Sequence, residues 1–265
     1  MRYKRLIALS TVVFLAGLGI LGSNKIPAAT ANRLELKLDA TKQTYTLGEP
    51  VELSFVLSNT GQDSLSLGCF GIGTGDVQLF ISRDEKNFLR YRAGWGNVDA
   101  VCNNSIKPGG QLEIPNVKIL WNYNPDLRHL NADSAAEVRK GMLTSDYAFP
   151  TPGTYYLKAT AFDGLSKLES APIKITVTDP VGDDLVIWNE MKADPDIGYF
   201  IQMGDIKTPS FQVEERDKFE LKLRHIVNEH PNSLYGEMLN DGLSKFQAAE
   251  VKRKEFQEKL KKSAN

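Results

Sequence analysis

The sequence predicts a mainly β protein with an added α part: an antiparallel β-sandwich followed by a small α-helical C-terminal segment. Between Arg33 and Thr178, apolar residues recur at every second position, the period of strands with one buried face. Short turns rich in glycine and proline separate these runs. After Asp179-Pro180 the apolar period becomes helical. We therefore expect a sandwich over 32–179 and a helical domain with a frayed basic end over 180–265.

The first 31 residues resemble an export signal in their charge and hydropathy. Basic residues at positions 2, 4 and 5 precede an apolar run of 16 residues, Leu6 to Leu21, and Ala29-Thr30-Ala31 offers a small-residue cleavage site. The run is shorter than the ~20 residues that a membrane-spanning helix needs. We expect cleavage before Asn32, a periplasmic or extracellular protein, and no integral membrane segment after cleavage; the alternative is that the apolar run is retained as an anchor.

The strands are expected where apolar and polar residues alternate. The turns between them supply fixed or left-handed backbone angles, as at Gly48-Glu49-Pro50 and Pro152-Gly153. Seven or eight short strands of this kind indicate an antiparallel sandwich. Their inward positions are Leu34, Leu36 and Leu38; Val51, Leu53, Phe55 and Leu57; Val77, Leu79 and Ile81; Leu112 and Ile114; Val117, Ile119 and Trp121; Tyr155, Leu157, Ala159 and Ala161; Ile173, Ile175 and Val177.

The helical segment is expected to begin at Asp183-Asp184, because acidic residues suit the positive end of a helix. We expect a first helix with Leu185, Trp188 and Met191 on its inward face. A short helix over 196–203 is expected to bury Tyr199, Phe200 and Met203. Two longer helices follow, with inward stripes at Phe219, Leu223, Ile226 and Val227 and at Tyr235, Met238, Leu239, Leu243 and Phe246. Trp188, Tyr199 and Phe200 are more aromatic surface than three short helices need, so we expect the helical segment to dock on the sandwich.

Charge narrows the classes of function. Residues 1–31 contain four basic residues and no acidic one, so cleavage lowers the 32 basic residues to 28 against 33 acidic ones, a net charge of about −5. This balance argues against nucleic acid as a partner, since a phosphate-binding face must be basic. Lys245 to Lys262 is locally basic. It is expected to be a solvated helix face, with contact to an anionic surface as the alternative.

Two cysteines are present, Cys69 and Cys102. An even pair in an exported chain is expected to form a disulfide, because that compartment is oxidising. The expected role of the bridge is structural.

No local pattern predicts a catalytic residue, a metal site or a cofactor. His225 and Glu229-His230 form a His-x-x-x-Glu-His spacing, in which the extra residue rotates one imidazole away from the other. The glycines between Gly71 and Gly75 precede a strand rather than a helix, so they do not indicate a phosphate site. A pair of carboxylates that meets only in space stays open as a hydrolase alternative.

Aromatic residues are the remaining candidates for binding. Trp95, between two glycines, is expected to be accessible, and together with an exposed Tyr91 or Tyr123 it could stack on a sugar or anchor a protein partner. Trp121 continues an inward strand period and is expected in the core. Tyr155 is expected to lock the fold near a strand corner.

Several short strings resemble a known family. Leu47 to Leu53 (LGEPVEL), Asn59, Lys107 to Gly110 (KPGG) and Phe149 to Tyr155 (FPTPGTY) follow an order similar to bacterial immunoglobulin-like domains, in particular the bacterial intracellular proteinase inhibitor family. The resemblance covers Leu34 to Val177. It implies an immunoglobulin-like fold and, as an activity, proteinase inhibition.

A second resemblance is helical. The segment His230 to Tyr235 (HPNSLY) resembles the turn of tetratricopeptide-type hairpins.

The expected function is a non-catalytic interaction module of the bacterial envelope. Binding is expected through the loops between Gly68 and Asn104 and an insertion over Asn122 to Ala148, with a protein or glycan as partner, because binding residues gather on irregular segments of a rigid scaffold. The alternatives are the proteinase inhibitor that the resemblance implies and an unrecognised carboxylate hydrolase.

Overall fold

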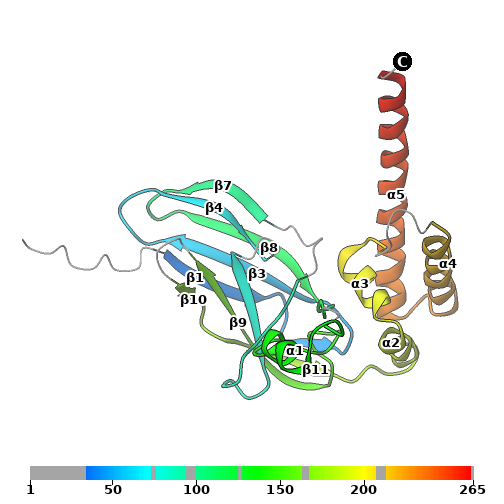
Figure 1. The fold of residues 1–265 in the computed structure, drawn as a ribbon, viewed down its shortest axis with the longest axis horizontal. Coiled ribbons are helices and arrows are strands. Elements are labelled where there is room, and N and C mark those ends of the chain that lie inside the picture. The colour runs from blue at the N-terminus through cyan, green and yellow to red at the C-terminus, as the bar shows by residue number, and fades with distance from the viewer. Residues whose placement is uncertain are drawn as a thin grey trace, which may run out of the picture. The chain divides into compact units, whose positions relative to one another are not determined.

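The computed structural model describes residues 34–72, 76–93, 100–124, 127–162, 167–206 and 213–263, and the expected export signal lies outside them. Over these ranges the protein is mixed α and β, with several mainly antiparallel sheets and five helices (Figure 1). Residues 32–265 form one compact unit. The last strand ends at Thr178 and the next helix begins at Asp183, which confirms the predicted change of structure at Asp179-Pro180.

The first sheet has three antiparallel strands in the order β1 (Leu34–Ala40), β3 (Val51–Asn59) and β8 (Gln111–Ile119). Every second residue of β3 is buried, as its sequence predicts. The two apolar runs of β8 belong to one strand that contains a β-bulge. The bulge arises because three steps from Ile114 to Val117 oppose two steps on β3, and Asn116 takes a positive φ of 58° there.

The second sheet has the order β2-β11-β9-β5-β6, and β10 also pairs with β9. Only the β2–β11 pair is parallel among these described pairings. The bounds are β2 (Thr44–Thr46), β5 (Val77–Ser82), β6 (Leu89–Arg90), β9 (Gly153–Phe162), β10 (Lys167–Glu169) and β11 (Ile173–Thr178).

A separate two-stranded ribbon joins β4 (Leu65–Gly71) to β7 (Ala100–Ile106) in antiparallel register. The sequence did not predict these strands, and the expected loop between Gly68 and Asn104 therefore contains regular structure. The register places Cys69 directly opposite Cys102. Directly opposed residues of an antiparallel pair have Cα atoms about 4.5–5.5 Å apart, which is within the range that a disulfide spans.

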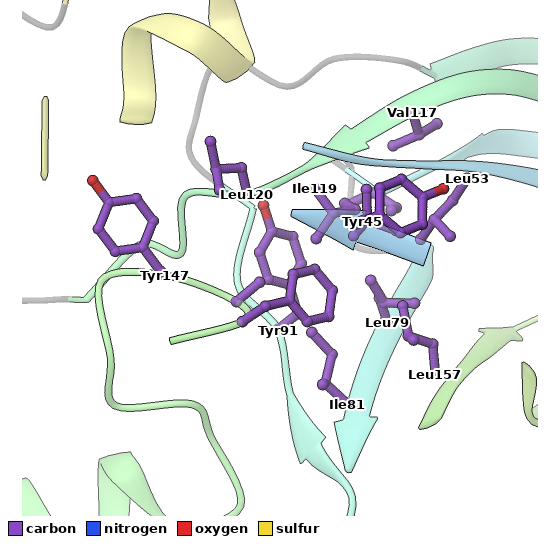
Figure 2. Packing of buried hydrophobic residues seen from close by; sticks show 14 of the residues in the cluster. Tyr45, Leu53, Leu79, Ile81, Tyr91, Val117, Ile119, Leu120, Tyr147 and Leu157 are labelled. Carbon is purple, nitrogen blue, oxygen red and sulfur yellow. The ribbon is translucent and has the colours of Figure 1, made fainter. Parts of the chain in front are cut away.

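The first two sheets share one hydrophobic core. Most of the predicted inward residues form it, and Leu53, Phe55 and Leu157 are fully buried, whereas Leu112 and Ile173 are only half-buried against it. Figure 2 shows side chains from both sheets facing one another: Leu53, Val117 and Ile119 from the first, and Leu79 and Leu157 from the second. Trp121 is also buried, as predicted.

The helices are α1 (Ala132–Arg139), α2 (Asp183–Ala193), α3 (Pro195–Met203), α4 (Val213–Glu229) and α5 (Leu234–Ser263). The predicted inward stripes of α4 and α5 are confirmed as buried or half-buried. The predicted inward face of α2 is wrong in part: Leu185 is 45% exposed, and Ile187 is buried in its place. In α3, Phe200 is buried, but Tyr199 and Met203 are only half-buried.

The helices dock on the sandwich, as the aromatic content predicted. Gln202 on α3 accepts hydrogen bonds from the Leu120 and Trp121 amides that follow β8, at 2.9 and 2.6 Å. The Tyr235 hydroxyl on α5 donates to the Leu47 carbonyl in the turn before β3. No helix within the described ranges is long and apolar enough to cross a membrane.

Candidate functional site

A pocket of about 450 Å³ lies between the end of β5 and the segment that leads into β9. One wall is the β5–β6 turn, from Ser82 to Asn87 and on to Leu89. The other wall runs from Leu143 to Ser145 at the end of the insertion and continues to Thr151. The antiparallel register of β5 and β9, in which Ser82 opposes Tyr156, brings these distant segments together.

The floor of the pocket is apolar. Ile81, Ala148 and Tyr155 contribute buried side chains to it. Leu89 lies at the mouth and is 39% exposed, and Leu143 is half-buried opposite it. An apolar floor with partly exposed leucines can take up an apolar group from a ligand and remove it from water.

Arg83 fixes the wall on the β9 side. Its Nη1 donates to the Thr151 side-chain oxygen at 2.8 Å, and its Nη2 donates to the Pro152 carbonyl at 3.1 Å. The guanidinium carbon lies 4.4 Å from the centroid of the Tyr155 ring. Gly153 has a φ of 130°, and a Cβ there would lie 2.6 Å from Nη2, so this approach requires glycine.

Tyr155 locks the corner before β9, as the sequence predicts. Its hydroxyl donates to the Thr151 carbonyl four residues upstream at 2.6 Å. Its ring packs edge-on against Phe149, with centroids 5.1 Å apart. The floor of the pocket is therefore fixed by hydrogen bonding as well as by packing.

Asp84 organises the β5–β6 turn. Its carboxylate accepts the Asn87 amide at 2.8 Å and the Lys86 amide at 3.0 Å, and the Ser82 hydroxyl donates to it at 2.9 Å. The hydrogen bond from the Asn87 amide, followed by those from Lys86 and Ser82, holds the pKa of Asp84 well below its usual range. Asp84 therefore stays ionised around neutral pH and lacks the raised pKa that a general acid needs.

The insertion wall is tied to the sandwich by backbone and amide contacts. The Arg90 amide of β6 donates to the Gly141 carbonyl at 2.7 Å, and the Leu143 amide donates to the Arg90 carbonyl at 3.1 Å. The fully buried Asn122 donates from Nδ2 to the Ser145 carbonyl at 2.8 Å. The two Arg90 bonds occupy the outer edge of β6, and together with the Asn122 bond they fix the insertion wall to the sandwich.

Of the aromatic residues considered for binding, Tyr91 and Tyr123 do not line this pocket. Tyr91 is only 3% exposed, so its ring does not meet the condition of exposure on which a binding role depended. Its hydroxyl donates to the Trp121 carbonyl at 2.8 Å and accepts from Gln202 Nε2 at 3.1 Å, and burial raises its pKa. Tyr123 is half-buried, with its ring centroid 6.0 Å from that of Trp121. Trp95 lies outside the described residues.

The histidines that the sequence analysis considered lie apart. The side chain of His225 is 70% exposed, and His230 Nδ1 lies 3.4 Å from an Asp183 carboxylate oxygen. Among the described residues, no group of three or more His, Cys, Asp or Glu side chains is placed to hold a metal ion.

Sequence reasoning missed the residues that do line the pocket, above all Arg83, Leu89 and Leu143. One signal was available in the chain. Ser82 to Asn87 reads as a polar turn around an aspartate, which predicts a rigid loop at a strand end. The proximity of this turn to the insertion depends on strand order, which the sequence does not reveal.

No protein family profile and no curated protein matches the chain. Solved structures share weak likenesses. The DNA glycosylase AlkC of Pseudomonas fluorescens is 16% identical at a TM-score of 0.27, covering 55% of this chain and 30% of the glycosylase. The sporulation control protein Spo0M of Bacillus subtilis is 11% identical at 0.28, covering 62% and 56%. A β-glucosidase of Erythrobacter marinus is 16% identical at 0.25, covering 55% and 15%.

This chain therefore matches less than two thirds of the length of each of these proteins. TM-scores this low establish no common fold, and the three activities differ from one another. None of them is carried over to this protein.

Proposed function

We propose that this protein is an exported, non-catalytic binding module with an immunoglobulin-like sandwich, and that its binding site is the pocket between the β5–β6 turn and the end of the insertion. The observation that supports this proposal most is the origin of the two pocket walls in the sequence. One wall, Ser82 to Leu89, and the other, Leu143 to Ala148, come from the two segments in which the sequence analysis expected binding. Binding residues commonly lie on such connections, held by a rigid scaffold.

The immunoglobulin-like assignment is supported by sheet arrangement and by one side chain. Two mainly antiparallel sheets cover a common core. The Tyr155 hydroxyl bonds back to the Thr151 carbonyl at the entry to β9, an arrangement similar to the tyrosine corner of immunoglobulin-like sandwiches. Export is supported by the charge and hydropathy of residues 1–31.

The chemistry of the pocket favours an apolar group of a protein or glycan partner. Its charged residues already have partners: Arg83 bonds to Thr151 and Pro152, and Asp84 bonds to its own turn. The leucines at the mouth remain partly exposed, so burying them is the main gain that a ligand can make. The volume lies within the range of about 300–1,000 Å³ that is typical of ligand pockets.

The test uses residues 32–265 and a substitution that fills the mouth. Thr144 is an exposed residue of the lining, so Thr144→Trp places an indole at the pocket without disturbing the core. Thr60→Trp, at an exposed turn position outside the lining, is the matched control. Binding is measured first with the apolar fluorescent probe 1-anilinonaphthalene-8-sulfonate.

We expect the control to bind this probe like the unmodified protein and Thr144→Trp to bind it about tenfold more weakly. Envelope extract is then passed over the three immobilised proteins, and a partner of the pocket is retained by all except Thr144→Trp. Equal binding by Thr144→Trp would refute the site. Hydrolysis of envelope substrates would refute the non-catalytic function, and sub-micromolar inhibition in a protease panel would replace the proposal by the inhibitor alternative.

A further inference from the structure

The C-terminal half of α5 extends past the hydrophobic core of the described chain. Phe246 is the last buried residue of the helix, which continues to Ser263. Beyond Phe246 every described side chain is exposed except Glu250, which is half-buried. Most helical stability in proteins comes from packing an amphipathic face. A helix that extends several turns past its own core is therefore suited to packing on something else.

Two of the three large apolar side chains that this half exposes share one face, and the third, Val251, lies on the opposite side of the helix. Phe256 is 62% exposed and Leu260 is 52% exposed. At about 100° per residue, positions 249, 256 and 260 fall on the same side of the helix. Lys252 and Lys259 lie along one edge of this side, while Glu250, Glu255 and Glu258 fall at least about 100° from its centre. The face is thus apolar at its centre and basic along its edge.

The charge of this half is opposite to that of the rest of the protein. Positions 247–263 contain six basic and three acidic residues, whereas positions 32–246 contain 22 basic and 30 acidic residues. An anionic surface would attract the helix and repel the body, so the helix would be the part that makes contact. A second copy of the helix would instead bring two positive segments together.

The base of this helix is anchored to its neighbour. Arg216 on α4 forms an ion pair with Glu250 at 2.6 Å, and Arg253 pairs with the other oxygen of the same carboxylate. Glu250 is 16% exposed in its side chain, so this contact is partly shielded from solvent. The position of the exposed half is thereby coupled to the α4–α5 hairpin.

We propose that residues 247–263 dock on an anionic phospholipid surface, with Phe256 and Leu260 inserted between head groups and Lys252 and Lys259 paired with lipid phosphates. A basic amphipathic helix of this composition lies in the plane of the interface and gains from both apolar burial and charge attraction. This surface is separate from the pocket, so either can function without the other.

The test uses the compact unit 32–265, which lacks the apolar N-terminal run, and measures cosedimentation with vesicles. Vesicles of phosphatidylcholine are compared with the same vesicles containing phosphatidylglycerol. We expect binding only to the anionic vesicles and a marked loss in high salt, because surface attraction is screened. Phe256→Asp and the double variant Lys252→Glu with Lys259→Glu should each weaken binding about tenfold or more.

Leu221→Asp is the matched control, since Leu221 is 66% exposed on α4 and lies outside the proposed face. It should bind like the unmodified protein, as should Thr144→Trp at the pocket. Circular dichroism without lipid confirms that each variant keeps its helices. Equal binding to neutral vesicles, no binding to anionic ones, or a dimer in sedimentation equilibrium that Phe256→Asp dissociates would each overturn the proposal.

Discussion

Gln202 offers the sharpest test of how the helices are held on the sandwich. It is 8% exposed, and its Oε1 accepts two backbone amides, from Leu120 at 2.9 Å and from Trp121 at 2.6 Å. Its Nε2 donates to the Tyr91 hydroxyl at 3.1 Å. One side chain therefore satisfies three buried polar groups of the sandwich. Gln202→Leu keeps a side chain of similar length and removes all three bonds.

The expected cost follows from the groups left without partners. Each buried amide that loses its acceptor costs about 1–3 kcal/mol, and the apolar side chain recovers part of this. We expect Gln202→Leu to lower the free energy of unfolding by about 3 kcal/mol. That is a large share of the roughly 5–15 kcal/mol of an ordinary domain.

Urea denaturation followed by tryptophan fluorescence and by far-UV circular dichroism measures this loss. Gln257→Leu, at an exposed position of α5, is the matched control and should change stability by less than about 0.5 kcal/mol. The two probes should report one shared transition in the unmodified protein, because helices and sheets share a core. A loss below about 1 kcal/mol in Gln202→Leu would refute the reasoning.

Three further predictions concern backbone, charge and covalent structure. Gly48→Ala should destabilise the protein by more than Gly109→Ala, although φ is positive at both positions (90° and 70°). Only the Cβ at position 48 would meet a side chain, since it would lie 2.6 Å from the indole ring of Trp188 on α2. Equal melting temperatures of the two variants would contradict this. Asp84, whose pKa folding lowers, adds stability that is full above about pH 4 and is lost as the pH falls further. Asp84→Asn should therefore be less stable than the unmodified protein at neutral pH, and urea titrations should converge in acid. A Cys69–Cys102 bridge should contribute about 3–4 kcal/mol. Protein purified without reductant from its native compartment should show no alkylated thiol by intact mass before reduction and two after it; two before reduction would rule the bridge out.

Alternation in the sequence predicted the strands of the two large sheets because each has one buried and one wet face. The ribbon of β4 and β7 was not predicted, because its strands do not show this division into a buried and a wet face. Leu65 and Leu67 on β4 are only half-buried, while Phe70 on β4 and Ile106 at the end of β7 are buried. A strand without a continuous buried face needs no regular alternation.

The inward face of α2 could not be fixed from the sequence, because four apolar residues are consecutive from Leu185 to Trp188. Such a run is compatible with several helix orientations. Docking selects one of them: Leu185 and Val186 stay about half exposed at 45% and 46%, and Ile187 is fully buried. The amount of apolar surface thus predicted that the helix docks, and the direction of docking depended on partners from distant strands.

The candidate site was predictable in its segments and not in its residues. Aromatic type alone suggested Tyr91, but its hydroxyl is satisfied inside the fold by Trp121 and Gln202, which the sequence does not place beside it. The pocket instead depends on how the insertion returns to the sandwich. Asn122 is buried where the insertion begins. Its side-chain oxygen accepts a hydrogen bond from the Arg92 amide at 3.0 Å, and its Nδ2 donates to the Ser145 carbonyl at 2.8 Å. Closing a longer loop costs little additional entropy. Because the Asn122 side chain fixes both ends of the insertion, the residues between these ends can vary in number and type while the wall of the pocket keeps its position.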